Sequence, residues 1–323
     1  LKSIDFHQKQ LDLAQTIEDR VGESQALASL GRAYLATGRM DTAVEHHERS
    51  LNISAQIKDN LGKGETLRYL GDVSVFVGEP EQAKDYYIQQ LELARVMNDS
   101  LIEGIALRKL GNVYRVLGTY EEAKAHYEES QEIAQTIEDR QGEGLSLLGR
   151  GEVSASEYDY DAALVVYETA IEIFEDIDDL SGQELSLHNI GEIYRLQSRY
   201  GRARDYYQKA LALSESSGDR KREGINRSRL GETFYAQSQY DQALEYYQQA
   251  LTISREKEVG DQISEGRTLT NIGDLFTDWG QYDKAITSYK SALEIQRTIG
   301  DRPNQGMTLN QLAYVYWYIS EYD

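Results

Sequence analysis

The sequence has no cysteine, only two prolines in 323 residues, and no long apolar run. The absence of cysteine excludes disulfides and thiolate metal sites and is typical of a reducing compartment. No apolar stretch approaches the roughly 20 residues that a membrane-spanning helix needs, and no signal peptide precedes the first helical pattern. We therefore expect a cytoplasmic protein without a membrane partner.

Positive charge is scarce as well. Lysine and arginine total 34 against 55 aspartates and glutamates, so the net charge is -21. This balance opposes binding to nucleic acid or to anionic lipid. The five histidines form no metal-ligand spacing, and neither a phosphate-binding glycine motif nor a nucleophile elbow occurs. We expect no catalytic residue, no metal and no cofactor.

What the sequence does contain is an internal repeat of 40 residues. An alanine lies twelve residues after each origin glycine, an aromatic residue or histidine lies sixteen after it, and an aspartate lies twelve before it. The step widens to 42 once, near Lys257 and Glu258, where we expect the rotation between repeats to change. The origins are Gly31, Gly71, Gly111, Gly151, Gly191, Gly231 and Gly273, with Ala313 in the eighth place.

Each repeat is predicted to form two helices joined by a tight turn. In residues 102–141, Leu110 and Tyr114 belong to a set of residues spaced by three and four, which share one helix face. Gly118 is suited to the left-handed conformation that ends a helix. A second helical pattern then continues to about Ile137.

Several recurring residues have structural interpretations. The aspartates precede the first helices and are expected to cap them, while Pro80 and Pro303 fall in first-turn positions. A glycine inside a helix costs about 1 kcal/mol relative to alanine, so its recurrence predicts close approach of the partner helix. The tyrosine stripe is interpreted as packing, and four of the histidines as core substitutes for tyrosine.

The order of Leu-Gly, tyrosine, a Gly-x-Tyr turn, and then alanine and tyrosine resembles the tetratricopeptide repeat. This resemblance implies an all-α fold, a right-handed α-solenoid (superhelix) of antiparallel helix pairs. The period of 40 and the missing terminal proline are similar to the longer-helix variety. That variety occurs in spindle-orientation adaptors and in bacterial proteins whose repeats precede a CHAT protease or a STAND-type ATPase.

We expect residues 1–323 to form a single array that belongs to a longer protein. Residues 1–18 match the second helix of a truncated repeat, seven full repeats span about 22–300, and 304–320 match the first helix of another truncated repeat. Neither end carries the polar capping helix that an array needs for solubility. End-to-end self-association of the chain is therefore possible.

The fourth repeat departs most from the pattern. Gly149 adds a second glycine, Arg150 replaces an aliphatic residue, Ser154 replaces tyrosine, and Tyr158 replaces the turn glycine. Fewer apolar contacts lower local stability. We predict that residues 145–185 bend or open first.

The first helices are expected to line a concave groove, with the side chains at about -6, -3, -2, +1, +4 and +5 from each origin projecting into it. Through Arg115 these positions hold five basic and two acidic residues, and from Glu152 to Asp278 three basic and five acidic. Arginine forks bind carboxylates in bidentate fashion, so the N-terminal half is predicted to take an acidic peptide segment. The C-terminal half would take a more basic one. The candidate binding residues are Arg68, Asp72, Arg108, Lys109, Asn112, Arg115, His188, Asn189, Arg195 and Arg229.

Arg108 and Asn112 match in type and place the arginine and asparagine groove positions of the spindle adaptors that the repeats resemble. The alternative is that the candidates form ordinary surface or inter-repeat ion pairs, each worth less than about 1 kcal/mol. Both interpretations stay open at the level of sequence.

The predicted function is a non-catalytic scaffold that binds a peptide or a partner-protein segment in its groove. The alternative is a ligand-sensing regulatory arm of a larger signalling enzyme whose catalytic domain lies outside the chain. A hydrolase within the chain is disfavoured, because acid–base chemistry needs a pocket that shifts a carboxyl pKa, and an open groove offers none.

Overall fold

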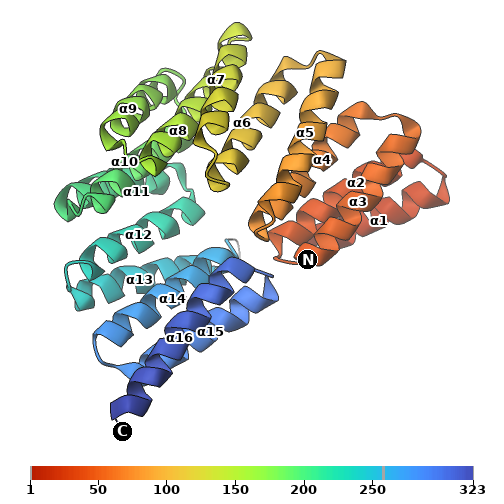
Figure 1. Cartoon of the computed structure of the whole chain (residues 1–323). Helices are drawn as coiled ribbons and strands as arrows, with labels where there is room; N and C mark the ends of the chain where they lie inside the picture. Colours follow the sequence, from red (N-terminus) through yellow and green to blue (C-terminus); the bar gives the residue numbers. More distant parts are fainter. Residues whose placement is uncertain (1, 257–258, 323) are drawn as a thin grey trace. The chain divides into compact units, whose positions relative to one another are not determined.

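The computed structural model describes residues 2–256 and 259–322, and within them it contains sixteen α-helices and no strand (Figure 1). The insertion near Lys257 and Glu258 lies outside the described residues. The chain divides into two compact units, Leu1–Val153 and Ser154–Asp323. The expectation of a single continuous array therefore stays a prediction, and each unit is described by itself.

The N-terminal unit contains seven whole helices and most of an eighth. They are α1 (Lys2–Thr16), α2 (Arg20–Ala36), α3 (Met40–Ile57), α4 (Asn60–Phe76), α5 (Pro80–Met97), α6 (Ser100–Val116), α7 (Tyr120–Thr136) and α8 (Arg140–Ser156). The C-terminal unit contains the rest. They are α9 (Tyr160–Asp176), α10 (Leu180–Leu196), α11 (Tyr200–Ser217), α12 (Arg220–Tyr235), α13 (Tyr240–Ser254), α14 (Gln262–Asp278), α15 (Tyr282–Thr298) and α16 (Arg302–Tyr322).

Short turns join the helices, and their geometry follows the predicted signals. Gly118 has a φ of 77°, and the next amide, of Thr119, donates to the carbonyl of Tyr114 over 2.9 Å. This is a helix end of the Schellman type. The prediction for Gly118 is confirmed, as is the placement of Pro80 and Pro303 in the first turns of α5 and α16.

The predicted aspartate caps are also confirmed. In all eight repeats the carboxylate accepts a backbone N–H from the first turn of the following helix, which satisfies one of its unpaired donors. The capping residues are Asp19, Asp59, Asp99, Asp139, Asp179, Asp219, Asp261 and Asp301.

The recurring glycine makes room for the ring of its partner helix. A Cβ atom at Gly111 would lie 2.8 Å from the ring of Tyr127, and one at Gly191 would lie 2.7 Å from the ring of Tyr207. Both rings are fully buried, as are the alanines twelve residues after each described origin. The close approach predicted from the glycine is confirmed, and the group that approaches is the tyrosine ring.

Histidine replaces this tyrosine in the first repeat. His47 is fully buried against Gly31, and burial together with the charge of Arg32 lowers its pKa to about 4. His46 and His126 pack beside Tyr34 and Tyr114 at ring distances of 5.1 and 5.0 Å. His47 is a core substitute, as predicted, whereas His46, His126 and His7 are only half-buried, and His7 contacts Gln10.

The fourth repeat has a packing reason for its extra glycine. A Cβ atom at Gly149 would collide with the ring of Tyr127, which comes from the preceding repeat. Tyr158 adopts a positive φ of 65° in the turn and is 79% exposed. The boundary between the two compact units, at Val153 and Ser154, falls within this repeat. Its early opening stays a prediction.

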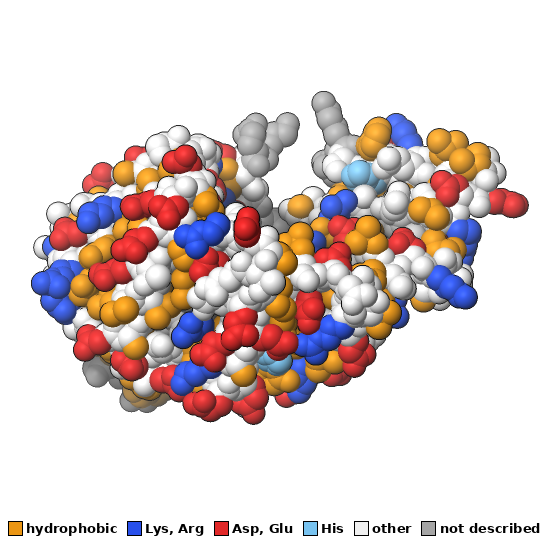
Figure 2. Space-filling model, turned by 90° about the horizontal axis from the view of Figure 1, so that it is seen from above, with side chains coloured by type: hydrophobic (Ala, Val, Ile, Leu, Met, Phe, Trp, Pro, Cys, Tyr) orange, Lys and Arg blue, Asp and Glu red, His pale blue; other side chains and the backbone are white. Residues whose placement is uncertain are grey.

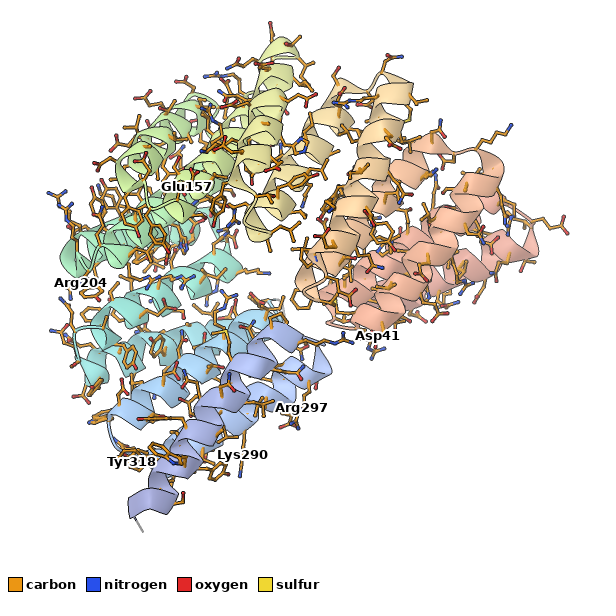
Figure 3. The ribbon with its side chains drawn as sticks, in the orientation of Figure 1. Asp41, Glu157, Arg204, Lys290, Arg297 and Tyr318 are labelled. Carbon is orange, nitrogen blue, oxygen red and sulfur yellow. The ribbon has the colours of Figure 1, made fainter. Side chains whose placement is uncertain are left out.

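The two kinds of helix form two layers within each unit. The first helices α2, α4 and α6 contact one another, and so do α12, α14 and α16, whereas the second helices mainly contact the first helices. Within each unit the first helices therefore form one contiguous layer, which we call the inner layer. Basic residues of the outer layer can pack on aromatic rings: the guanidinium of Arg204 on α11, labelled in Figure 3, lies 4.9 Å from the ring centre of Phe234.

Candidate binding surface on the first helices

We call the side chains at positions -2, +1 and +4 of the first helices, together with Arg68 at -3 and Asp278 at +5, the inner face. Each +1 residue that can accept a hydrogen bond is a potential partner for the buried tyrosine at +16 of its own repeat, and four such bonds form at 2.6–2.7 Å. The bonds run from Tyr87 to Asp72, from Tyr127 to Asn112, from Tyr207 to Glu192 and from Tyr289 to Asp274.

The same +1 residues are linked to the next repeat. A donor at -2 of the following first helix, or at +4 of the preceding one, reaches the acceptor, so a ladder of polar contacts runs along each inner face. Its rungs are Lys109 to Asp72 at 2.7 Å, Arg115 to Glu152 at 3.0 Å, Arg229 to Glu192 at 3.1 Å and Asn271 to Glu232 at 3.1 Å.

In the N-terminal unit, basic side chains gather around Tyr69. The guanidinium of Arg68 lies 4.1 Å from the ring centre of Tyr69 and that of Arg32 lies 5.6 Å from it. On its other side, Tyr69 stacks on buried His47 at 5.2 Å. Arg68 reaches Asp72 only at 3.4 Å, because this carboxylate already accepts from Tyr87 and a lysine. Arg32 donates to the hydroxyls of Tyr69 and Ser29 and has no carboxylate partner among the described residues.

Arg108 does not belong to this surface, which corrects the expectation from its offset. It lines a small crevice with Ser130 and Ile133 of α7 and with Asp139, and burial lowers its pKa. The inner-face contacts of α6 come from Lys109, Asn112 and Arg115. In the second repeat, by contrast, Arg68 at the same -3 offset reaches Tyr69 and Asp72. Asn112 contacts Tyr127 whereas Arg108 lines the crevice, and the binding role of the pair stays a prediction.

His188 is the second residue whose placement differs from the expectation. It also lies at -3, is 8% exposed, and contacts Asn226 of α12 over 3.0 Å. Asn226 in turn donates to buried Glu184 over 2.6 Å. Burial lowers the pKa of His188 to about 4. Its side chain takes part in packing between α10 and α12 and does not reach the inner face. Asn189 is half-buried, and its amide nitrogen is unpaired among the described residues.

In the C-terminal unit the ladder is more strongly paired. Burial alone would raise the pKa of Glu192, but Arg229 and Arg195 together lower it to about 2. Arg229 contacts Glu192 at 3.1 Å and Glu232 at 2.8 Å, so it joins two repeats. Arg195 donates to Glu192 at 2.8 Å. These arginines reach the inner face but are already engaged.

The C-terminal end of this ladder is acidic. Burial, with a further contribution from Asp278, raises the pKa of Asp274 to about 6. Asp278 accepts from Tyr235 of α12 over 2.5 Å. Sequence reasoning placed both aspartates in the groove but did not select them as binding residues. It also missed the hydroxyl bonds of the tyrosines, because periodicity indicates only that a ring is buried.

Apolar side chains accompany the charged ones on the last turns of the first helices. Val75, Val116 and Leu196 are 41%, 57% and 50% exposed. Acidic and basic side chains are interspersed on the face shown in Figure 2, with apolar ones between them. The last turns of the first helices thus offer apolar area close to the charged inner-face positions.

The described part of the chain lacks two features, a membrane-spanning helix and a group of metal-binding side chains. No described helix is long and apolar enough to cross a membrane. No three described histidine, aspartate or glutamate side chains are grouped so that they could hold a metal ion.

Comparison with known families decides the affiliation. The family described as tetratricopeptide repeat matches residues 1–56, 24–95, 102–176, 182–256 and 264–323. The chain belongs to the tetratricopeptide repeat family. No curated protein sequence matches it. The predicted all-α solenoid of helix pairs is confirmed by this match and by solved structures with the same fold.

Three of these structures show how far the likeness of the tetratricopeptide repeat chain extends. Aspartyl phosphate phosphatase F of Bacillus subtilis is 16% identical with a TM-score of 0.66, covering 90% of this chain and 75% of its own. A Rap protein complexed with Competence and Sporulation Factor is 13% identical with a TM-score of 0.59, covering 93% and 99%. A STAND protein with a tetratricopeptide repeat sensor from Pyrococcus horikoshii is 17% identical with a TM-score of 0.55, covering 99% and 54%. At these identities the likeness concerns the fold.

Proposed function

We propose that the chain is a non-catalytic cytoplasmic scaffold whose inner face binds a peptide or a partner-protein segment with acidic residues. The observation that carries the proposal is the charge excess on the N-terminal inner face, where four basic side chains meet two acidic ones. The basic residues are Arg32, Arg68, Lys109 and Arg115, and the acidic ones are Asp72 and Glu152.

The cluster around Tyr69 is pre-organised for a carboxylate. Stacking on buried His47 fixes the tyrosine ring, and the ring supports the guanidinium of Arg68. Asp72 already accepts hydrogen bonds from Tyr87 and Lys109, so the guanidinium groups of Arg32 and Arg68 retain N–H donors for a ligand. A planar guanidinium group binds a carboxylate in bidentate fashion. Because the side chains of Tyr69 and Arg68 are already held in place, binding costs little side-chain entropy, which favours affinity.

Apolar contacts would add to this electrostatic recognition. Val75 and Val116 are exposed on the last turns of α4 and α6, on the same helices as Arg68 and Lys109. A Rap protein of this fold has been crystallised in complex with Competence and Sporulation Factor, which supports the idea that such a solenoid can hold a partner. Asn112 and Arg115 belong to the proposed surface, while Arg108 and His188 contribute through packing.

The test is selection from a random peptide display library, followed by fluorescence polarisation with the selected peptides. We expect enrichment of aspartate and glutamate. Replacing Arg32 and Arg68 by glutamate should weaken binding about tenfold or more, since charge-assisted bonds are lost and repulsion is added.

The matched control replaces Arg49 and Lys209 by glutamate, which changes the net charge equally. Both are exposed on second helices, eighteen residues after their repeat origins. The affinity of this control variant for the selected peptides should stay within about twofold of that of the unchanged chain, as expected for charges outside an interface. Selection without acidic enrichment, or equal losses in both variants, would overturn the proposal.

A second candidate is a ligand-sensing arm of a larger signalling enzyme. It is favoured by the match of 99% of this chain to a STAND protein with a tetratricopeptide repeat sensor, of which the chain covers 54%. A P-loop or a CHAT-type His/Cys pair encoded beyond residue 323 would support this candidate. A gene without either would leave the scaffold as the better proposal.

Self-association stays part of the proposal. Phe6 and Leu13 of α1 are 60% and 61% exposed, and Tyr316 and Trp317 of α16 are 46% and 56% exposed. Apolar surface of this kind favours association. Sedimentation velocity should show the mass rising between micromolar and millimolar concentrations, and a constant monomer mass would contradict it.

A further inference from the structure

We propose that the C-terminal unit contains a binding site for an organic cation, the ammonium or guanidinium group of a lysine or arginine in a bound peptide. The site is formed by Asp274 and Asp278 of α14, Tyr235 of α12 and the hydroxyl of Tyr247 of α13. It rests on the proposed function, since it assigns the partner chemistry of the second inner face.

The first observation is an interruption of the ladder. At Asp72 and Glu192 the +1 carboxylate receives a tyrosine hydroxyl from its own repeat and a basic side chain from the next one. Asp274 receives Tyr289 over 2.6 Å, but the -2 residue of the next repeat is the neutral and exposed Gln311.

Asp278 adds to this unneutralised charge. It lies one helical turn after Asp274 and accepts only a tyrosine hydroxyl, so no lysine or arginine among the described residues pairs with either aspartate. Two carboxylates four residues apart on a helix repel each other and attract a cation. The raised pKa of Asp274 is the consequence expected for a partly buried carboxylate that lacks such a partner.

The second observation is independent of the aspartates. Tyr247 is fully buried, and its hydroxyl has no hydrogen-bond partner among the described residues. Glu232, the acceptor expected from the other repeats, is instead engaged by Arg229 and Asn271. An unpaired buried hydroxyl is unfavourable and calls for a partner.

The surroundings of the Tyr247 hydroxyl point to where that partner would lie. The groups that act on it electrostatically include Glu232, Tyr235 and Asp274, so it lies near the acidic region of α12 and α14. The ligand group must therefore donate a hydrogen bond to a hydroxyl oxygen and also satisfy carboxylates. An ammonium or guanidinium group does both.

Aromatic rings next to the aspartates favour an organic cation. Tyr235 lies 6.3 Å from Tyr240, whose ring lies 5.7 Å from Trp279, the neighbour of Asp278. Electron-rich ring faces attract lysine and arginine. A metal ion is a poorer fit, because the described carboxylates do not form a group of three that could hold one.

Two end-blocked, fluorescein-labelled peptide pools of equal length test the proposal at physiological salt. One pool has lysine or arginine at two central positions, and the other has glutamate there. The inner-face variant is Asp274→Asn with Asp278→Asn, which should fold, since Asn112 already accepts the tyrosine hydroxyl at the same position of the third repeat.

This inner-face variant should weaken binding of the cationic pool about tenfold or more, through loss of charge-assisted bonds. Tyr247→Phe should weaken it about threefold while the melting temperature stays equal or rises, because only an unpaired hydroxyl is removed. A merely structural role of Tyr247 would not lower affinity under those conditions.

The control variant is Asp241→Asn with Glu245→Gln, an exposed pair with the same spacing on the outer helix α13. It removes equal charge and should bind the cationic pool within about twofold of the unchanged chain. Equal weakening by the inner and outer pairs, or no effect of Tyr247→Phe, overturns the cation site.

The glutamate pool separates this inference from the proposed function. If the glutamate pool binds and the cationic pool does not, the cation site is wrong and the scaffold proposal stands. If neither pool binds, the proposed function itself fails. Binding of the glutamate pool should be unchanged by all three variants.

Discussion

The two units place opposite charge on equivalent positions of one scaffold. On the N-terminal inner face four basic side chains meet two acidic ones, and the guanidinium of Arg32 has no carboxylate partner among the described residues. On the C-terminal inner face Arg195 and Arg229 meet four acidic side chains, the last two of which are Asp274 and Asp278. The excess is two positive charges in one unit and two negative in the other.

The difference teaches which positions of the repeat are free to vary. The aspartate cap, the glycine, the buried alanine and the ring at +16 recur because each makes a contact within the scaffold. In four repeats the +1 residue accepts a tyrosine hydroxyl, and aspartate, asparagine and glutamate each occur in this role. Inner-face charge can therefore change from unit to unit without a change of fold.

The largest change in stability is expected at the origin glycines, because both units depend on the same contact between glycine and tyrosine ring. Gly111→Ala and Gly191→Ala should each cost about 1–3 kcal/mol of unfolding free energy, because the new methyl group overlaps a buried tyrosine ring. Gly201 also lies in a helix, but nothing approaches it within 4 Å. Gly201→Ala should therefore stabilise the chain by about 0.5–1 kcal/mol.

Urea denaturation measures all three glycine variants. Costs that are similar in the two units, with the opposite sign at Gly201, are the expected pattern. A neutral effect at Gly111 or Gly191 would mean that the ring does not set the distance between the paired helices.

Acid should destabilise the two units to different extents. The folded pKa of His47 is about 4, below the ordinary 6.5, so its stabilising contribution is complete above pH 6.5 and is lost as the pH falls toward 4. This loss amounts to about 2 kcal/mol between about pH 7 and pH 5. His188 loses a similar amount in the C-terminal unit, since its folded pKa is also about 4.

In the C-terminal unit Asp274 acts in the opposite direction. Its folded pKa of about 6 lies above the ordinary 3.8, so stability is gained as the pH falls through 6. Hydrogen-exchange protection factors should therefore fall more in α2–α6 than in α12–α14 between about pH 7 and pH 5. His47→Tyr, which restores the residue of the other repeats, should remove the sensitivity of the N-terminal unit. Equal acid sensitivity of the two units would contradict this assignment.

A smaller change in stability should distinguish arginines that form ion pairs from those that form none. Arg229→Met leaves Glu192 and Glu232 without their shared partner and should cost about 1–2 kcal/mol. Arg32→Met removes no ion pair among the described residues and should change stability by less than about 0.5 kcal/mol. Thermal unfolding of both variants provides the test, and an equal cost for the two would remove the distinction on which the proposed binding surface rests.

The smallest effect concerns the repeat that contains the boundary between the units. Amides of residues 145–185 should show protection lower by about 1 kcal/mol than those of residues 111–137, since α8 carries four glycines. Hydrogen exchange at neutral pH measures the difference directly. Equal protection in the two segments would refute the predicted early opening.

Much of the fold followed from the sequence because its determinants are local. Asp139 and its equivalents cap helices through amides three residues away, and Gly118 ends a helix by its own conformation. The pairing of origin glycine and tyrosine was visible as a fixed spacing, although the spacing did not reveal that the ring itself fills the place of a Cβ atom.

The binding surface followed only in part, because it depends on direction and on neighbouring repeats. Lys109 and Arg229 reach the inner face as their offsets predicted. Of the candidates one residue earlier, Arg68 also reaches it, while Arg108 and His188 turn between the helices. A shift of one residue rotates a helical side chain by about 100°, which an approximate offset rule cannot resolve. The unpaired hydroxyl of Tyr247 depends on three repeats and has no signature in the sequence.

The most direct test of the central claim is a map of amide chemical-shift changes on adding the glutamate peptide pool to the isotope-labelled chain. We predict changes concentrated on α2, α4 and α6 around Arg32, Arg68 and Lys109, and their disappearance in the Arg32→Glu, Arg68→Glu variant. Changes spread over the second helices, or centred on α12 and α14, would contradict the assignment of acidic partners to the N-terminal inner face.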